Sequence, residues 1–166
     1  MRFKPTRELC YLAGVMDNWR ADEKSYVGVR TKSDETVERF VKYAVTLGVD
    51  TRKIMIEQIG ETQHAYFYHS KIARMIRETL EKRTTLPRRN RELAVCLVAG
   101  MFDSKGRVTD RGVYLGRLDR ADALMLENLG VRTKETRILT IGVFLEMIRK
   151  ESVLAGSVHI GKKITE

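Results

Sequence analysis

The residue types that commonly carry out chemistry are few in this sequence, and their spacing excludes most kinds of site. The three histidines, His64, His69 and His159, have no partners at the spacing of a metal centre, so roles at the surface or in a hairpin are expected. Cys10 and Cys96 form no CxxC pair and lie in apolar runs, where reduced core thiols are the rule. The sequence contains no glycine-rich loop of the kind that cradles phosphates. What remains is a pair of carboxylates in two matching strings.

The two strings have the same residue types in the same order: Leu-Ala-Gly-Val-Met-Asp at 12–17 and Val-Ala-Gly-Met-Phe-Asp at 98–103. A small-residue pair inside a bulky apolar helix lets another backbone approach closely. The simplest packing therefore sets helix against helix at Ala13-Gly14 and Ala99-Gly100. Asp17 and Asp103 then close their helices, where a carboxylate opposes the helix dipole and is a poor choice for stability alone. The recurrence argues against two ordinary core helices that are similar by chance.

On these strings, and on an order of elements that repeats along nearly the whole chain, the sequence resembles the LAGLIDADG homing endonucleases in their single-chain, two-repeat form. The resemblance implies an α/β fold of the α+β type. A duplicated α-β-β-α-β-β-α unit with pseudo-twofold symmetry would place two antiparallel saddle sheets around two central motif helices. In that family the sheets sit in the DNA major groove. The last acidic residue of each motif, two positions beyond the first Asp, binds the divalent metals at the scissile phosphates.

The sequence departs from the family pattern at both metal positions, which hold Trp19 and Lys105. Mg²⁺ requires hard oxygen ligands. An indole has none, and an ammonium group repels a cation but suits a bound phosphate. We therefore expect a catalytically degenerate member with no metal, no cofactor and no catalytic residue. Three other carboxylates nearby in the sequence keep an active endonuclease with displaced ligands as an alternative; they are Asp22, Glu23 and Asp110.

Basic residues recur in the segments expected to form strands and in their turns. Every second side chain of a strand faces one way, so Arg30 and Lys32 share a face, as do Arg132 and Lys134. If the other face of each sheet packs on helices, these cations line an exposed concave surface; the alternative is a solvated, salt-bridged surface. The expected nucleic-acid-binding residues are Arg30, Lys32, Arg52, Lys53, Lys105, Arg107, Arg111, Arg117, Arg132, Lys134 and Arg137. Asn and Gln are few, which favours phosphate contacts over base reading.

The elements that would position these residues occur twice in the order helix, strands, helix, hairpin, helix. The first set is a helix opened by Pro5 or Thr6 with its apolar stretch at 9–16, a strand at 25–31, a helix from Ser33 to Gly48, a hairpin at 52–69 and a helix at 70–82. The second is a helix capped by Asn90 with its apolar stretch at 93–102, strands at 106–109 and 113–118, a helix ending at Gly130, a hairpin at 132–141 and a helix at 143–151. The first strand has no clear partner between 17 and 25. We expect repeats at 1–83 and 91–156, a linker at 84–90 and a tail at 157–166, with both repeats in one domain.

Charge and composition indicate the class of partner. The 166 residues include 31 Lys and Arg against 22 Asp and Glu, a formal charge of +9, and the pI is near 9.7. A basic, well-patterned globular chain points to a polyanion, here duplex DNA or structured RNA. The longest apolar run, 93–102, is about half the length of a membrane helix, so no membrane partner is expected. Reduced cysteines favour the cytoplasm, and the repeat favours a monomer.

Together these features predict a non-catalytic nucleic-acid-binding protein that contacts the phosphate backbone through basic strands. Two alternatives stay open. One is a metal-dependent DNA endonuclease that uses displaced carboxylates. The other is a binding face recruited to a protein partner, inside a ribonucleoprotein or a transcription complex. The sequence leaves open whether the nucleic acid is DNA or RNA.

Overall fold

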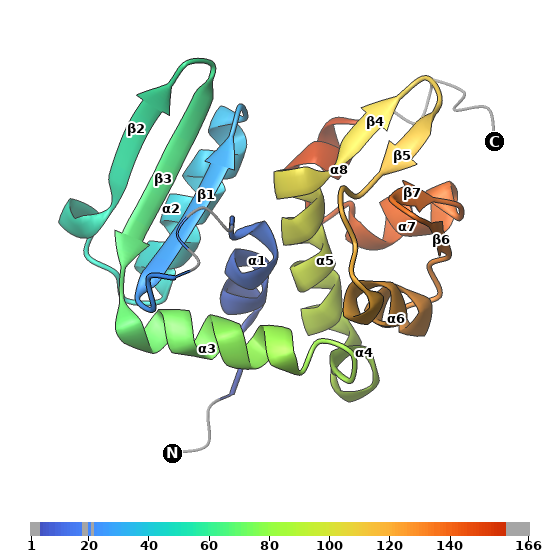
Figure 1. Cartoon of the computed structure of the whole chain (residues 1–166), viewed down its shortest axis with the longest axis horizontal. Coiled ribbons are helices and arrows are strands. Elements are labelled where there is room, and N and C mark those ends of the chain that lie inside the picture. Colours follow the sequence, from blue (N-terminus) through green and yellow to red (C-terminus); the bar gives the residue numbers. More distant parts are fainter. Residues whose placement is uncertain (1–3, 18–19, 21, 159–166) are drawn as a thin grey trace.

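The two helices that contain the repeated strings lie side by side at the centre of the molecule (Figure 1). The structure is a computed structural model that describes residues 4–17, 20 and 22–158. Helix α1 (Arg7–Val15) begins after Thr6, whose side chain accepts a hydrogen bond from the Leu9 N–H. Helix α5 (Arg91–Lys105) begins after Asn90, which caps Leu93 in the same way. Such caps satisfy backbone donors that a helix leaves unpaired at its amino end.

The first half surrounds α1 with a three-stranded sheet and two helices. Its further elements are β1 (Tyr26–Thr31), α2 (Asp34–Thr46), the 3₁₀ turn η1 (Thr51–Lys53), β2 (Met55–Ile59), β3 (Thr62–Tyr68) and α3 (Ser70–Glu81). The antiparallel sheet has the order β1-β3-β2. No strand is present among residues 20 and 22–24, the described part of the segment between Asp17 and Ser25.

The second half arranges the same kinds of element around α5, with a four-stranded antiparallel sheet of order β4-β5-β7-β6. Its elements are β4 (Arg107–Thr109), β5 (Gly112–Tyr114), α6 (Arg120–Asn128), β6 (Thr133–Lys134), β7 (Arg137–Ile138), α7 (Ile141–Ile148) and α8 (Val153–Ser157). The short helix α4 (Leu86–Arg89) lies inside the segment expected as a linker. The expected fold class, with two antiparallel sheets around two central helices, is therefore confirmed.

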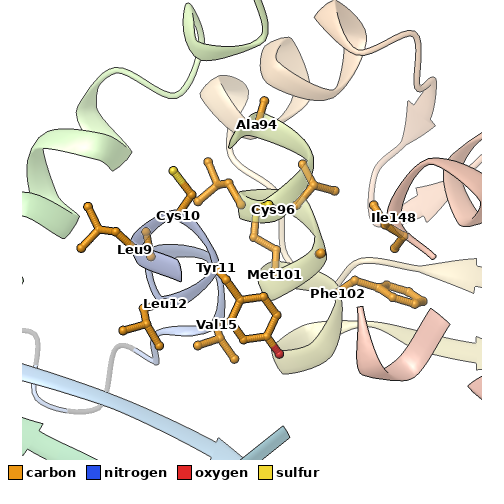
Figure 2. Packing of buried hydrophobic residues seen from close by; sticks show 14 of the residues in the cluster. Leu9, Cys10, Tyr11, Leu12, Val15, Ala94, Cys96, Met101, Phe102 and Ile148 are labelled. Carbon is orange, nitrogen blue, oxygen red and sulfur yellow. The ribbon is translucent and has the colours of Figure 1, made fainter. Parts of the chain in front are cut away.

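The central helices cross at the positions that the sequence predicts. A Cβ atom on Gly14 would lie 2.0 Å from the Leu97 carbonyl oxygen, and one on Gly100 would lie 2.3 Å from that of Tyr11. Ala13 and Ala99 are buried beside them. Figure 2 shows the side chains of α1 and α5 meeting between the helices, with Phe102 and Ile148 on the other side of α5. Backbone therefore touches backbone at both glycines, and apolar side chains surround the contact.

Some strand boundaries differ from the expectation. The segment expected as a strand at 113–118 is a strand only as far as Tyr114, because Gly116 takes a left-handed φ of +72° that turns the chain. Arg52 and Lys53, expected in a strand, lie in η1, where the Asp50 side chain accepts from the Arg52 N–H. The second hairpin keeps only two residues in each strand.

One arginine joins the two halves away from the central helices. Arg83, just beyond α3, donates to Asp119 at 2.7 Å and to Asp122 at 2.9 Å. Both carboxylates belong to the capping box at the amino end of α6. The contact fixes the end of the first half against a helix of the second. Within the described part of the chain, no helix is both long and apolar enough to cross a membrane.

Candidate nucleic-acid interface

One row of cross-strand partners gathers cations on the open face of the second sheet. Arg107 lies opposite Tyr114, Tyr114 opposite Arg137, and Arg137 opposite Lys134. Directly opposed residues of antiparallel strands share a face, so all four side chains project to the same side. The next row, which includes Val113 and Ile138, is buried against the helices.

The side chains of this row are available to solvent. Arg107, Lys134 and Arg137 are exposed, and Tyr114 is half-buried between them. The Arg107 guanidinium lies 5.1 Å from the centre of the Tyr114 ring, a cation–π contact that holds it over the sheet. Neighbouring strands lie about 4.8 Å apart, so the row crosses the sheet from β4 to β6 roughly at right angles to the strands. We call Arg107, Tyr114, Lys134 and Arg137 the basic row.

The other predicted cations of the second half surround the basic row. Arg111 is exposed in the β4–β5 turn, where its carbonyl oxygen accepts from Arg137 at 3.1 Å. Arg117 and Arg132 are exposed in the loops that follow β5 and α6. Lys105 is exposed at the end of α5. The second half thus contains most of the predicted cations, gathered on and beside one sheet.

In the first half the predicted cations are more dispersed. Arg30 is exposed on β1 between buried neighbours and lies opposite His64 on β3. Lys32 pairs with Glu61 at 3.2 Å. Arg52 pairs with Asp50 at 2.7 Å and, like Lys53, lies off the sheet in η1. The prediction that Arg52 and Lys53 lie on a strand is therefore wrong.

The carboxylate of the second motif, Asp103, is held by hydrogen bonds that connect α5 to α1 and α8. Asp103 is buried and accepts four hydrogen bonds: from the Tyr11 hydroxyl at 2.5 Å, from the Ser152 hydroxyl, and from the backbone N–H groups of Val153 and Leu154 at 2.9 and 3.0 Å. The last two groups open α8. Asp103 lies in the last turn of α5, where its charge opposes the dipole, yet it also faces the amino end of another helix, where a negative charge is favourable.

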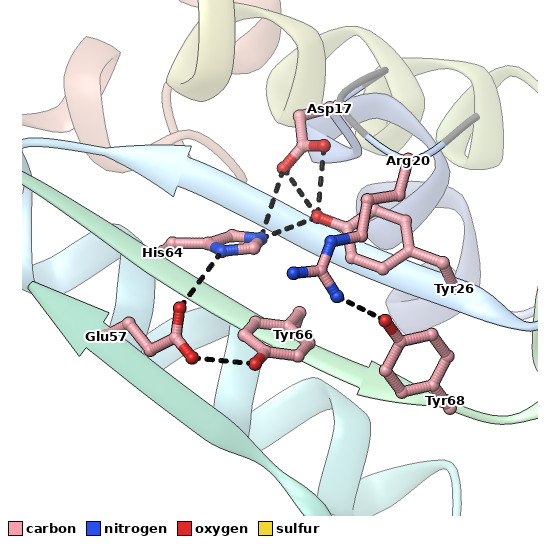
Figure 3. Close-up of polar contacts among 7 residues, drawn as sticks. All are labelled: Asp17, Arg20, Tyr26, Glu57, His64, Tyr66 and Tyr68. Carbon is pink, nitrogen blue, oxygen red and sulfur yellow. Dashed lines mark hydrogen bonds and ion pairs between the residues drawn. The ribbon is translucent and has the colours of Figure 1, made fainter. Parts of the chain in front are cut away.

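The first motif carboxylate belongs to a network that spreads over the open face of the first sheet (Figure 3). The Tyr26 hydroxyl lies 3.0 and 3.1 Å from the two Asp17 oxygens and 2.7 Å from His64 Nε2. Asp17 and Glu57 each place a carboxylate oxygen 4.0 Å from a ring nitrogen of His64. Burial lowers the pKa of His64, although both carboxylates act in the opposite direction.

Arg20 and two tyrosines extend this network. The Arg20 guanidinium carbon lies 5.0 Å from the centre of the Tyr66 ring, and the guanidinium donates to the Tyr68 hydroxyl. Tyr66 donates to Glu57 at 2.8 Å. This cluster is not among the sites that the sequence predicts, and His64 is expected from the sequence at a surface or in a hairpin. His64 does lie on the β2–β3 hairpin, but it is fully buried. The spacing of His64, Tyr66 and Tyr68 could have indicated the cluster, because every second residue of a strand lies on the same face.

The two positions that the family resemblance assigns to the metal, and the three carboxylates near them in the sequence, decide whether a metal could bind. Trp19 lies outside the described residues, whereas Lys105 presents an ammonium group at the other motif. Asp22 and Glu23 are exposed in the loop after α1, and Asp110 is exposed in the β4–β5 turn. Within residues 4–17, 20 and 22–158, no three His, Cys, Asp or Glu side chains form a group that could hold a metal ion. With Asp103 engaged by four donors and Lys105 cationic, the donor set at the second motif does not fit Mg²⁺.

Comparison with known proteins gives the fold. No family model and no curated protein matches the sequence. Mesophilic variants of the homing endonuclease I-DmoI match with a TM-score of 0.65 and 15% identity, over 87% of this chain and 96% of theirs. I-DmoI in complex with DNA and Ca matches with a TM-score of 0.64 and 16% identity, over 86% and 88%. An I-DmoI variant with its target DNA and Mg matches at 0.64 and 16%, over 92% and 97%.

At these identities the likeness shows the fold alone. The chain has the LAGLIDADG fold of I-DmoI, with both of its sheets, and that part of the sequence-based resemblance is confirmed.

Proposed function

We propose that this protein binds duplex DNA through the open face of its second sheet, chiefly by phosphate contacts, and does not cleave it. The basic row is the observation that carries the proposal, because it presents Arg107, Arg137 and Lys134 in one line across an exposed sheet. The formal charge of +9 provides a long-range attraction to a polyanion. The solved structures of I-DmoI with DNA support DNA over RNA as the first partner to test.

The absence of cleavage is proposed on side-chain chemistry. Cleavage assisted by a metal needs carboxylates that hold the ion against a polyanionic backbone. The two positions that the family resemblance assigns to this role hold Trp19 and Lys105. Lys105 can instead contact a phosphate directly. In this proposal the protein binds DNA with its basic surface, and Lys105 contacts a phosphate at the position where a nuclease would hold a metal ion.

A salt titration tests the proposal. Affinity for a random-sequence duplex should fall linearly on a log–log plot against salt, because phosphate contacts release counterions. Arg107→Gln, Lys134→Gln and Arg137→Gln should each lower the slope by about one unit. Lys42→Gln on α2 and Lys71→Gln on α3 are matched controls, since both lysines are exposed on helices. Arg137→Lys keeps the charge and should keep the slope.

The outcomes separate the proposal from its alternatives. Equal effects of the helix controls would show that the sheets are not the binding face. No binding to duplex DNA at low salt would overturn the DNA proposal, and binding of structured RNA in its place would reassign the partner. Binding of an acidic protein, with neither nucleic acid bound, would favour the protein-partner alternative.

A further inference from the structure

The open face of the first sheet differs in chemistry from the basic row. Met55 and Ile59 of β2 and Tyr68 of β3 are 49%, 40% and 44% exposed. The cross-strand register places all three on this face: Met55 lies opposite Tyr66, Ile59 lies opposite Thr62, and Tyr68 follows two positions after Tyr66. Large apolar side chains at this exposure do not contact phosphates favourably. This face is therefore suited to a different part of the ligand.

Charge leads to the same conclusion. The cations on or above this face are Arg20, Arg30 and Lys32, and the carboxylates beside them are Asp17, Glu23, Glu57 and Glu61. Three cations therefore meet four carboxylates, in contrast to the basic row, which contains cations and one tyrosine. A phosphate backbone gains little from a face without net positive charge, since its affinity comes mainly from cations. An uncharged, flat group gains more.

Arg20, Tyr66, Tyr68 and Met55 form a surface of the right shape, which we call the stacking platform (Figure 3 shows all but Met55). The Arg20 guanidinium stacks over Tyr66, and its hydrogen bond to Tyr68 ties the two together. Tyr66 and Tyr68 meet nearly edge to face, with ring centres 6.0 Å apart. The platform thus combines a guanidinium plane and an exposed ring, groups on which nucleobases stack, with the apolar side chain of Met55 beside them.

We infer that the stacking platform binds unpaired nucleobases next to a duplex held by the basic row. Bases inside a duplex present only their edges to a groove, so their faces can reach a ring only where pairing ends. The preferred ligand is then a duplex with a single-stranded segment beside it. The inference rests on the proposed function, because the second sheet must hold the duplex. It adds that the two sheets bind different parts of one nucleic acid.

Paired probes test the inference with the intact protein. A blunt DNA duplex is compared with the same duplex carrying a single-stranded tail that contains a fluorescent adenine analogue. The wild-type protein should bind the tailed duplex about tenfold more tightly and quench the analogue, as expected for one stacked base. Tyr68→Ala should remove this preference and the quenching, yet leave affinity for the blunt duplex unchanged.

Matched variants separate the ring from other effects. Tyr68→Phe keeps the ring and should keep most of the preference. Val45→Ala removes a side chain of similar exposure from α2, away from the platform, and should change neither probe. Arg137→Gln should weaken both probes alike.

Two results would be decisive against the inference. Equal wild-type affinity for the two probes would overturn it while leaving the proposed function intact. So would an equal loss on both probes in Tyr68→Ala, provided that circular dichroism shows the variant folded. Failure to bind either probe would instead contradict the proposed function itself.

Discussion

His64 is a titratable side chain enclosed by other charged groups. It is fully buried, with Asp17 and Glu57 at its two nitrogens and Arg20 and Arg30 nearby. Desolvation by burial holds its pKa below the ordinary value of 6.5 despite the carboxylates. The imidazole of the folded protein is therefore neutral under conditions in which an unfolded chain already binds a proton there.

This lowered pKa makes stability depend on pH with a definite sign. Well above pH 6.5 the imidazole is neutral in both the folded and the unfolded protein, so its titration does not change the free energy of unfolding. As the pH falls from 6.5 towards the folded-state pKa, only the unfolded chain gains a proton, so the free energy of unfolding decreases. Urea unfolding between about pH 7 and pH 5 should show a steeper loss for the wild type than for His64→Gln. Parallel profiles for the two proteins would contradict the assignment.

Asp103 gives a second prediction at the scale of one residue. Asp103→Ala leaves the buried Tyr11 hydroxyl and the first N–H groups of α8 without their acceptor. Such a loss costs roughly 1–3 kcal/mol, or more because the acceptor is charged. Denaturant unfolding should report this cost, and amide exchange should accelerate at Val153 and Leu154. Asp110→Ala, in an exposed turn, is the control and should change stability by less than about 0.5 kcal/mol.

At the scale of elements, the contact between α1 and α5 dominates the fold. A Cβ added at Gly14 or Gly100 meets backbone atoms, which cannot move aside as a flexible side chain can. Gly14→Ala and Gly100→Ala should each destabilise the protein by about 1–3 kcal/mol or more through overpacking. Gly142→Ala in α7 is the matched control, because no atom lies within 4 Å of its added Cβ. Thermal unfolding should leave that control within about 1 kcal/mol of the wild type. Equal midpoints for all three variants would mean that the helices do not touch at the glycines.

The sequence indicated the helices well because their ends are marked locally. Ser33 caps α2, and Gly48 follows its end with φ of +95°. Strand limits depend on tertiary packing instead. Leu115 continues the apolar alternation and is fully buried, yet it lies in the loop that follows β5. Burial alone therefore does not distinguish a strand residue from a packed loop residue.

The residues of the candidate site also differ in whether local sequence patterns could predict them. Cations such as Arg137 and Lys134 could be named from their positions in one short hairpin, and their place on an exposed strand followed from alternation. The cluster around His64 could not, because Tyr26 and Glu57 reach it from other strands, and their register is set by long-range pairing. The role of Asp103 at α8 was likewise out of reach, since that helix lies about fifty residues further along the chain.

At the scale of the whole molecule, the prediction concerns catalysis. Incubation with a random-sequence duplex library in Mg²⁺ or Mn²⁺ should produce no cuts, because Trp19 and Lys105 occupy the two positions that the family resemblance assigns to metal-binding carboxylates. Trp19→Asp combined with Lys105→Asp should restore metal binding, measured by calorimetry. Cleavage need not return, since the groups that orient metal ligands act from outside the ligand set. Reproducible metal-dependent cuts that vanish in Asp22→Asn, Glu23→Gln or Asp110→Asn would establish the endonuclease alternative.

The unequal sheets give the molecule a polarity. Three strands with an aromatic face that has no net positive charge lie on one side of the central helices, and four strands with a cationic row lie on the other. A ligand spanning both sheets meets different chemistry at its two ends, so turning it end for end is not equivalent. A palindrome would offer this protein no advantage, and an asymmetric nucleic acid would sit in one orientation. Attaching a cleaving reagent to one sheet at a time would then mark opposite ends of the same bound strand.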